Sequence, residues 1–143
     1  MPKPLQVYIV EDSQIIQRLL ASAITASGAE LSGFSDDAQR AIADVYTLQP
    51  DLIVIDIRLA SGSGFDVLTA LQDHSLAPEA TKVVLSNYAD DEYRKLSLRL
   101  GADRFFDKSV EASQALALIN TLAARKRAGS TPLRFSSAEL AAA

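Results

Sequence analysis

Charged side chains follow apolar segments at three points of this chain. Glu11 and Asp12 come directly after the first apolar segment, Asp56 after a later one, and Lys108 after the last. Three carboxylates at one rim of a sheet repel one another, and a hard cation such as Mg²⁺ offsets that repulsion. A lysine beside them binds an anion such as a phosphate oxygen. Together these residue types predict phosphoryl transfer onto a carboxylate, with Asp56 as a candidate acceptor.

The predicted metal site uses few protein ligands, because Mg²⁺ keeps several waters and takes one or two carboxylates plus phosphate. We expect Asp12 and Asp56 to bind the ion directly, and Glu11 to bind it directly or through water. A backbone carbonyl just after Asp56 would complete the protein ligands. Ser86, which ends another apolar segment, offers a hydroxyl to one phosphate oxygen, and Lys108 offers an ammonium to another.

Each of these residues alone has an ordinary interpretation. Glu11 and Asp12 could cap a helix, Asp56 could sit in a turn, and Lys108 could be a surface lysine. A coincidence explains the set poorly, because acids, hydroxyl and lysine each follow a different apolar segment. The set therefore favours one shared site.

The elements that must position these residues alternate between two periodicities. Apolar, β-branched segments predict strands at 5–10, 29–34, 51–56, 81–85 and 103–106. Helical spacing predicts helices between Asp12 and Gly28, and at 35–48, 65–72, 90–101 and 111–127. This alternation predicts an α/β fold with a parallel sheet covered on both faces. Ligands of such sheets bind at the carboxyl ends of the strands, where the acids are expected.

Length and charge exclude several classes of protein. The 143 residues fit one domain at 1–127, with a tail at 128–143 that is either loose or docked on the domain or a partner. The net charge of −4 argues against a nucleic-acid surface, and the lack of cysteine excludes disulfides and zinc fingers. With no signal peptide or membrane span in the sequence, we expect a cytoplasmic protein.

Phe34, Phe65 and Phe106 are expected in the core.

Five short motifs give the chain a resemblance to the receiver domain of bacterial two-component response regulators, over about residues 5–125. They imply a flavodoxin-like, doubly wound five-stranded parallel sheet in the order 2-1-3-4-5 with five helices. The motifs are Val10-Glu11-Asp12, Ile55-Asp56 with Gly64 eight residues on, Leu85-Ser86, Gly101-Ala102-Asp103 and Phe105-Phe106-Asp107-Lys108.

The resemblance implies a role for each site residue. Asp56 would receive a phosphoryl group from a phosphohistidine on a sensor histidine kinase or a histidine phosphotransfer protein. The chain would act as a switch and not as an enzyme, beyond gaining and losing its own phosphoryl group. Mg²⁺ would be bound by Glu11, Asp12, Asp56 and the backbone carbonyl of Arg58, phosphate by Ser86 and Lys108, and Phe105 would turn inward on activation.

The resemblance also implies a surface that changes with phosphorylation. The fourth helix, fifth strand and fifth helix would form it, with Tyr93, Arg94 and Leu98 as candidate contacts. A downstream protein of unknown identity, or a second copy of the chain in a phosphorylation-dependent homodimer, would bind there. Direct binding to nucleic acid or a membrane is not expected.

Three positions depart from the family pattern. Ser109 follows the lysine where proline is common, so we expect a trans peptide there and Ser109 as a cap of the last helix. Ala60 also replaces a common proline. Asn87 is larger than the usual residue after the hydroxyl and is expected to narrow the path between Phe105 and Ser86.

Three residues near the acceptor and three rival functions complete the hypotheses. Arg58, Tyr88 and Asn87 are expected to modulate the lifetime of the phosphoryl group, the first two by shielding it from water. A haloacid dehalogenase-type phosphatase needs a second acid where Arg58 stands. A flavodoxin-like electron carrier needs an anion site where Glu11 would repel anions. The remaining alternative is a receiver-like interaction scaffold that is not phosphorylated.

Overall fold

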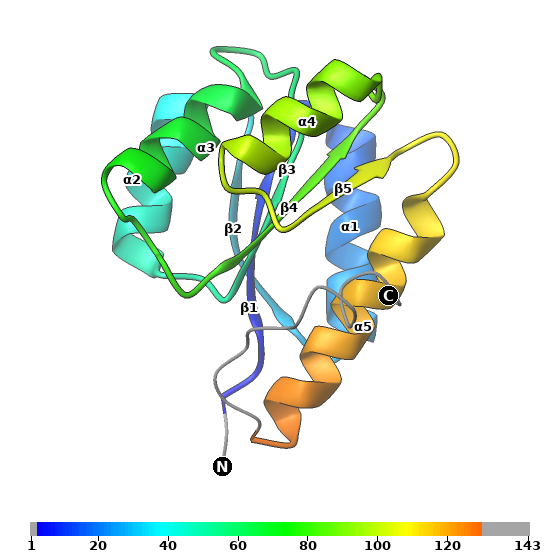
Figure 1. Cartoon of the computed structure of the whole chain (residues 1–143). Coiled ribbons are helices and arrows are strands. Elements are labelled where there is room, and N and C mark those ends of the chain that lie inside the picture. The colour runs from blue at the N-terminus through cyan, green and yellow to red at the C-terminus, as the bar shows by residue number, and fades with distance from the viewer. Residues whose placement is uncertain (1–2, 130–143) are drawn as a thin grey trace.

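The computed structural model describes residues 3–129, in which five strands alternate with five helices (Figure 1). Each element forms close to its predicted place. The strands are β1 (Gln6–Val10), β2 (Glu30–Ser35), β3 (Leu52–Ile55), β4 (Thr81–Ser86) and β5 (Arg104–Asp107). The helices are α1 (Gln14–Ala26), α2 (Ala38–Leu48), α3 (Gly64–Asp73), α4 (Asp91–Arg99) and α5 (Ala112–Arg127).

The strands form one parallel sheet in the order β2-β1-β3-β4-β5, which confirms the predicted flavodoxin-like order. β3 lies in the middle, between β1 and β4, and all four of its residues are buried, as the apolar run Leu52–Ile55 requires. The chain moves outward from β1 to β2 on one side and from β3 to β5 on the other. The carboxyl ends of β1 and β3 therefore flank the topological switch point, where ligands of such sheets bind.

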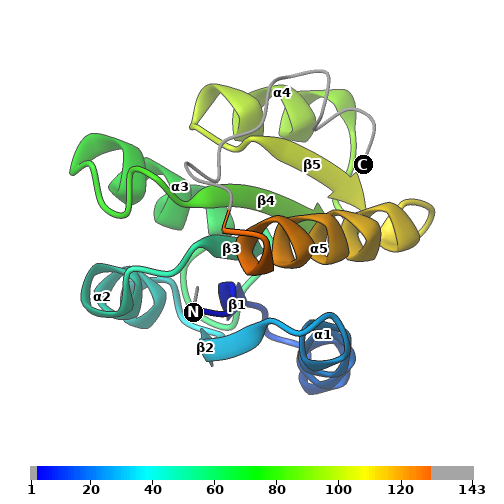
Figure 2. The same ribbon diagram turned by 90° about the horizontal axis from the view of Figure 1, so that it is seen from below.

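Helices cover both faces of the sheet (Figure 2). α1 and α5 pack on one face, where Ile24 and Leu118 join the apolar side chains of the strands. α2, α3 and α4 lie over the other face, where Val45 and Leu68 contribute to a second apolar layer. The sheet is thus packed between two apolar layers, one on each face, and these layers fix the position of the strands and of the rim at their carboxyl ends.

Polar caps set where the helices begin, and they leave the first acids available. The N-cap of α1 is Ser13, whose side chain accepts a hydrogen bond from the Ile16 N–H at 3.3 Å. Glu11 and Asp12 therefore precede the cap of α1. α3 begins with a capping box formed by Ser63 and Asp66, the third residue of the helix.

Two sequence predictions about single residues are wrong. Phe34 is 55% exposed because it lies on β2, an edge strand of the sheet, whereas Phe106 is fully buried as expected. Ser109 does not cap α5, whose N-cap position is Glu111 without a side-chain cap hydrogen bond. Among residues 3–129, no helix combines the length and apolarity that crossing a membrane requires. Residues 130–143, nearly all of the expected tail, lie outside the described residues.

Candidate functional site

The predicted site residues lie at the carboxyl ends of four neighbouring strands. Glu11 and Asp12 follow β1, Asp56 follows β3, Ser86 is the last residue of β4, and Lys108 follows β5. The sheet continues just past the strands: the Asp56 N–H donates to the Val10 carbonyl at 2.8 Å, and the Lys108 N–H donates to the Ser86 carbonyl at 3.0 Å. Parallel pairing thus brings five residues from four separate parts of the chain to one rim.

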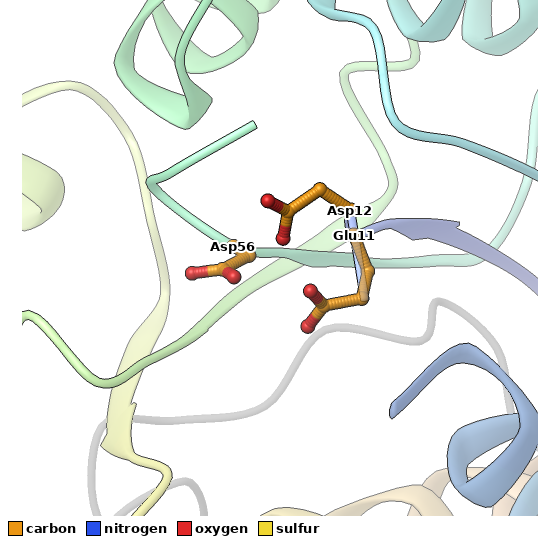
Figure 3. A group of neighbouring side chains, drawn as sticks. All are labelled: Glu11, Asp12 and Asp56. Atoms are coloured by element: carbon orange, nitrogen blue, oxygen red, sulfur yellow. The ribbon is translucent and has the colours of Figure 1, made fainter. Parts of the chain in front are cut away.

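Three carboxylates gather round one space at this rim (Figure 3). One oxygen each of Glu11, Asp12 and Asp56 lie within 4.8 Å of one another. Glu11 is 2% exposed and Asp56 6% exposed, while Asp12 is open to solvent. Two acids of the cluster are therefore buried, and the third, Asp12, is in contact with the surrounding water.

Lys108 reaches into this cluster. Its Nζ donates to Glu11 Oε1 at 2.5 Å and to Asp56 Oδ2 at 2.9 Å, and only 10% of its side chain is exposed. Burial lowers the pKa of Lys108, but the hydrogen bonds that Lys108 donates to Glu11 and Asp56 outweigh burial and raise the pKa above its usual value. The lysine consequently stays charged and compensates part of the buried negative charge.

Burial dominates the protonation of Glu11. It raises the pKa of Glu11 to about 7, against the opposing hydrogen bonds from Lys108 and from the Ser13 N–H. Three carboxylates facing one ammonium also leave a surplus of negative charge when all are ionised. These donors are all hard oxygen atoms, and the surplus charge suits a divalent cation, so the residues present fit Mg²⁺.

The loop after β3 is packed tightly against the acceptor candidate. Asp56 Oδ1 accepts the Ile57 N–H at 2.7 Å, and the Ile57 carbonyl accepts the Gly64 N–H at 2.8 Å. A Cβ on Gly64 would lie 2.3 Å from the Asp56 carbonyl oxygen, closer than any side chain permits. Only glycine therefore lets α3 begin this close to Asp56.

Arg58 and Tyr88 form one wall beside this rim. The Arg58 guanidinium lies 4.7 Å from the centroid of the Tyr88 ring, a cation–π contact between the loops after β3 and β4. Tyr88 also meets Tyr93 edge to face at 6.3 Å, and Tyr93 lies 5.6 Å from Phe65. The wall thus continues to α4 and α3.

Ser86 and Phe105 lie below the surface, and Asn87 does not. Ser86 is fully buried, and its Oγ accepts the Tyr88 N–H at 3.1 Å, which leaves the hydroxyl hydrogen free to donate. Phe105 is 5% exposed, so its ring already occupies the inward position that the resemblance assigns to activation. Asn87 is exposed, so its predicted effects on the Phe105 path and on phosphoryl lifetime stay predictions.

This chain matches a known family over most of its length. The family model of the response regulator receiver domain matches residues 7–120. The chain belongs to that family. Receiver domains bind Mg²⁺ at an acidic pocket, and this receiver has an acidic cluster of Glu11, Asp12 and Asp56.

Relatives with a curated description place the receiver within two-component signalling. It is 30% identical over 126 residues to the KDP operon transcriptional regulatory protein KdpE of Escherichia coli K12, covering 88% of this chain and 54% of KdpE. It is 31% identical over 111 residues to the acid tolerance regulatory protein ActR of Rhizobium meliloti, covering 78% of this chain and 56% of ActR. The receiver thus spans about half the length of these relatives.

Solved structures confirm the fold of the receiver. A CheY-like response regulator receiver domain protein from Methanospirillum hungatei superposes with a TM-score of 0.75 at 23% identity, covering 90% of this chain and all of that one. The phosphorylated cyanobacterial phytochrome response regulator RcpA gives a TM-score of 0.72 at 23% identity, with coverages of 90% and 97%.

Sequence reasoning missed two features of this receiver. Glu111 contacts Arg94, and the aromatic wall links Tyr93 to Tyr88. Arg94 and Glu111 are separated by 17 residues, and neither stands at a position whose spacing or periodicity marks a site. Only the packing of α4 against β5 brings them together.

Proposed function

We propose that this chain is a phosphorylation-activated receiver in which Asp56 accepts a phosphoryl group from a phosphohistidine. The donor would be a sensor histidine kinase or a histidine phosphotransfer protein. The observation that carries the proposal is the double hydrogen bond of Lys108, at 2.5 Å to Glu11 and 2.9 Å to Asp56, inside a cluster of three carboxylates. A lysine used only for solubility would not be buried among acids.

The chemistry follows from the positions of these groups. The Asp56 carboxylate attacks phosphorus, and the bond from phosphorus to the donor imidazole nitrogen breaks, with its electron pair leaving on that nitrogen. Asp12, Asp56 and the Arg58 carbonyl would hold Mg²⁺, with Glu11 binding directly or through water. When bound, Mg²⁺ supplies positive charge that screens the approach of the anionic donor.

The other residues respond to the new phosphoryl group. Lys108, which lies against Asp56 before transfer, would bind one phosphate oxygen, and the buried Ser86 hydroxyl would donate to another. Phe105 would then report the change to the surface made by α4, β5 and α5, which a downstream protein or a second copy of the chain would bind. Catalysis is confined to gain and loss of the receiver's own phosphoryl group.

Mass spectrometry tests the proposal. The wild-type protein with Mg²⁺ should gain one phosphoryl adduct from acetyl phosphate or from phosphoramidate, which contains a phosphorus–nitrogen bond. Asp56→Asn should gain none, and a chelator should suppress the wild-type adduct. Asp73→Asn, at an exposed aspartate near the end of α3, is the matched control and should behave as wild type.

The opposite result is equally clear. A wild-type protein that gains no adduct from either small donor or from histidine kinases would contradict the proposal and favour the unphosphorylated scaffold. An adduct that persists in Asp56→Asn would move the acceptor to another residue.

A further inference from the structure

An ion pair joins α4 to the start of α5 across β5. Arg94 Nη2 lies 2.8 Å from Glu111 Oε1, and the two side chains are 34% and 22% exposed. The other side of the guanidinium is also held, since Arg94 Nε donates to the Ala89 carbonyl at 3.2 Å. The Arg94 side chain is thus fixed at two points, although it stands on the face expected to meet partners.

The fixed guanidinium covers Phe105. Its central carbon lies 5.0 Å from the centroid of the Phe105 ring, a cation–π contact, and the ring is 5% exposed. An outward swing of the ring would have to displace a side chain tied to both Ala89 and Glu111. Arg94 therefore closes the inward position of Phe105 from the solvent side.

The same carboxylate also holds the loop that carries Lys108. Glu111 Oε1 accepts the Asp107 N–H at 2.9 Å, and the Asp107 carbonyl accepts the Glu111 N–H at 2.7 Å. These reciprocal bonds enclose Lys108, whose own N–H donates to the Ser86 carbonyl at 3.0 Å. The lysine backbone is thereby held between β4 and the start of α5.

Ser109 completes the closure of this loop. Its N–H and its hydroxyl donate to Asp107 Oδ1 at 2.8 and 2.6 Å. Ser109 has no ring to restrict its φ angle, so the conformation of residues 107–111 depends on hydrogen bonds. Bonds from Ser109 lower the pKa of Asp107, and the bond from Arg94 lowers that of Glu111, so both acids stay ionised near neutral pH.

We propose that Glu111 and Arg94 are positioning residues. Glu111 fixes the loop that holds Lys108 against Asp56, and the Arg94 guanidinium keeps the Phe105 ring inward. The proposal rests on the proposed function of Asp56, because the positioned lysine serves phosphoryl transfer. Neither residue contacts the carboxylate cluster, so each acts through another group. Arg94 is accordingly an internal contact as well as a candidate partner residue.

Two substitutions at Glu111 separate the two effects. Glu111→Gln keeps an oxygen that accepts the Asp107 N–H but loses the charge that pairs with Arg94. Glu111→Ala loses both interactions. Arg94→Ala loses the ion pair, the hydrogen bond to the Ala89 carbonyl and the cover over the ring, and it keeps the bond between Glu111 and the Asp107 N–H. Glu92→Ala and Lys95→Ala, at exposed positions of α4, are the matched controls.

Three measurements apply to each variant with Mg²⁺ present: the rate of phosphorylation by acetyl phosphate, amide hydrogen exchange at Asp107, and the NMR signals of the Phe105 ring. We expect Glu111→Ala to slow phosphorylation about three- to tenfold and to speed exchange at Asp107. Glu111→Gln and Arg94→Ala should leave the phosphorylation rate and the exchange at Asp107 near wild type. Both variants should nevertheless shift or broaden the Phe105 signals. Arg94→Lys should restore these signals in part.

The proposal is overturned if Glu111→Ala matches wild type in rate and in Asp107 exchange, or if the controls lose as much as Glu111→Ala. If Arg94→Ala leaves the Phe105 signals unchanged, the Arg94 guanidinium does not hold the ring inward. A wild-type protein that accepts no phosphoryl group would defeat the proposed function instead. Exchange at Asp107 and the ring signals would then still decide whether Arg94 and Glu111 hold these two groups.

Discussion

Lys108 connects buried acids that would otherwise be unstable together. Its ammonium contacts both Glu11 and Asp56, which are almost fully buried, whereas Asp12 remains in contact with solvent. Removing one partner of a buried ion pair leaves an uncompensated charge, which is strongly destabilising. Loss of activity in Lys108→Ala would therefore mix a missing phosphate contact with damage to the cluster, and residues at the edge of the site give cleaner tests.

Arg58 and Tyr88 are such residues. Each single change, Arg58→Ala or Tyr88→Ala, removes one half of their cation–π contact and should open the phosphoryl group to water. We expect the phosphoryl lifetime to shorten about two- to fivefold, and less than additively in the double mutant, because the two side chains act as a unit.

The lifetime is measured from the decay of the phosphorylated form after the donor is removed. Tyr46→Ala, at an exposed tyrosine on α2, is the control. Unchanged lifetimes in both single mutants would show that the wall does not shield the site.

At the scale of elements, the start of α3 determines how closely a helix approaches the acceptor. Gly64 has no side chain, and the Asp56 carbonyl occupies the space where a Cβ would lie. The Gly64 N–H also closes the loop on the Ile57 carbonyl. The position of Asp56 thus depends on α3 as well as on β3.

Gly64→Ala should therefore disturb the site as well as the helix. The new Cβ would stand 2.3 Å from the Asp56 oxygen, so the main chain has to move. We expect a loss of about 1–3 kcal/mol in the free energy of unfolding, together with weaker Mg²⁺ binding.

Urea unfolding and calorimetric Mg²⁺ titration measure the two effects. Thr69→Ala, in the same helix, is the control for a change inside α3. Wild-type stability and Mg²⁺ affinity in Gly64→Ala would show that the contact relaxes without cost.

At the scale of the whole molecule, folding itself shifts the protonation of the site. Two apolar layers surround the sheet, and burial at its rim raises the pKa of Glu11 to about 7. Because this value exceeds the usual one of 4.5, the folded metal-free protein favours neutral Glu11. That contribution to stability is fully present below pH 4.5 and is lost as the pH rises through about 7.

Mg²⁺ should therefore stabilise the protein more at pH 8 than at pH 6. Mg²⁺ binding favours ionised Glu11, so at pH 6 the Glu11 carboxyl must first lose its proton. The affinity for Mg²⁺ should therefore be up to about tenfold lower at pH 6 than at pH 8. Lys108, whose pKa is raised, stays charged throughout this range.

Thermal unfolding with and without Mg²⁺ at both pH values measures this difference. Glu11→Gln cannot ionise and should respond to Mg²⁺ almost equally at pH 6 and pH 8. Equal Mg²⁺ shifts at both pH values in the wild-type protein would mean that Glu11 does not titrate between them.

Much of the fold could be read from the sequence, because its signals are local. Apolar runs and helical periodicity predicted the ten elements, and the family motifs predicted the strand order. Phe34 was misplaced because an apolar residue in a strand indicates burial only where a helix covers that face. β2 is an edge strand, and the ring of Phe34 stays exposed.

The order of residues was enough to predict which chemical groups meet at one rim: Glu11, Asp12, Asp56, Ser86 and Lys108 each follow or end a strand, and the carboxyl ends of parallel strands share an edge. How those groups pair became visible only in the folded chain. Lys108 bonds to Glu11 across 97 residues, and Arg94 bonds to Glu111 across 17. Such contacts depend on side-chain direction and on how a helix packs, and neither is encoded in local spacing.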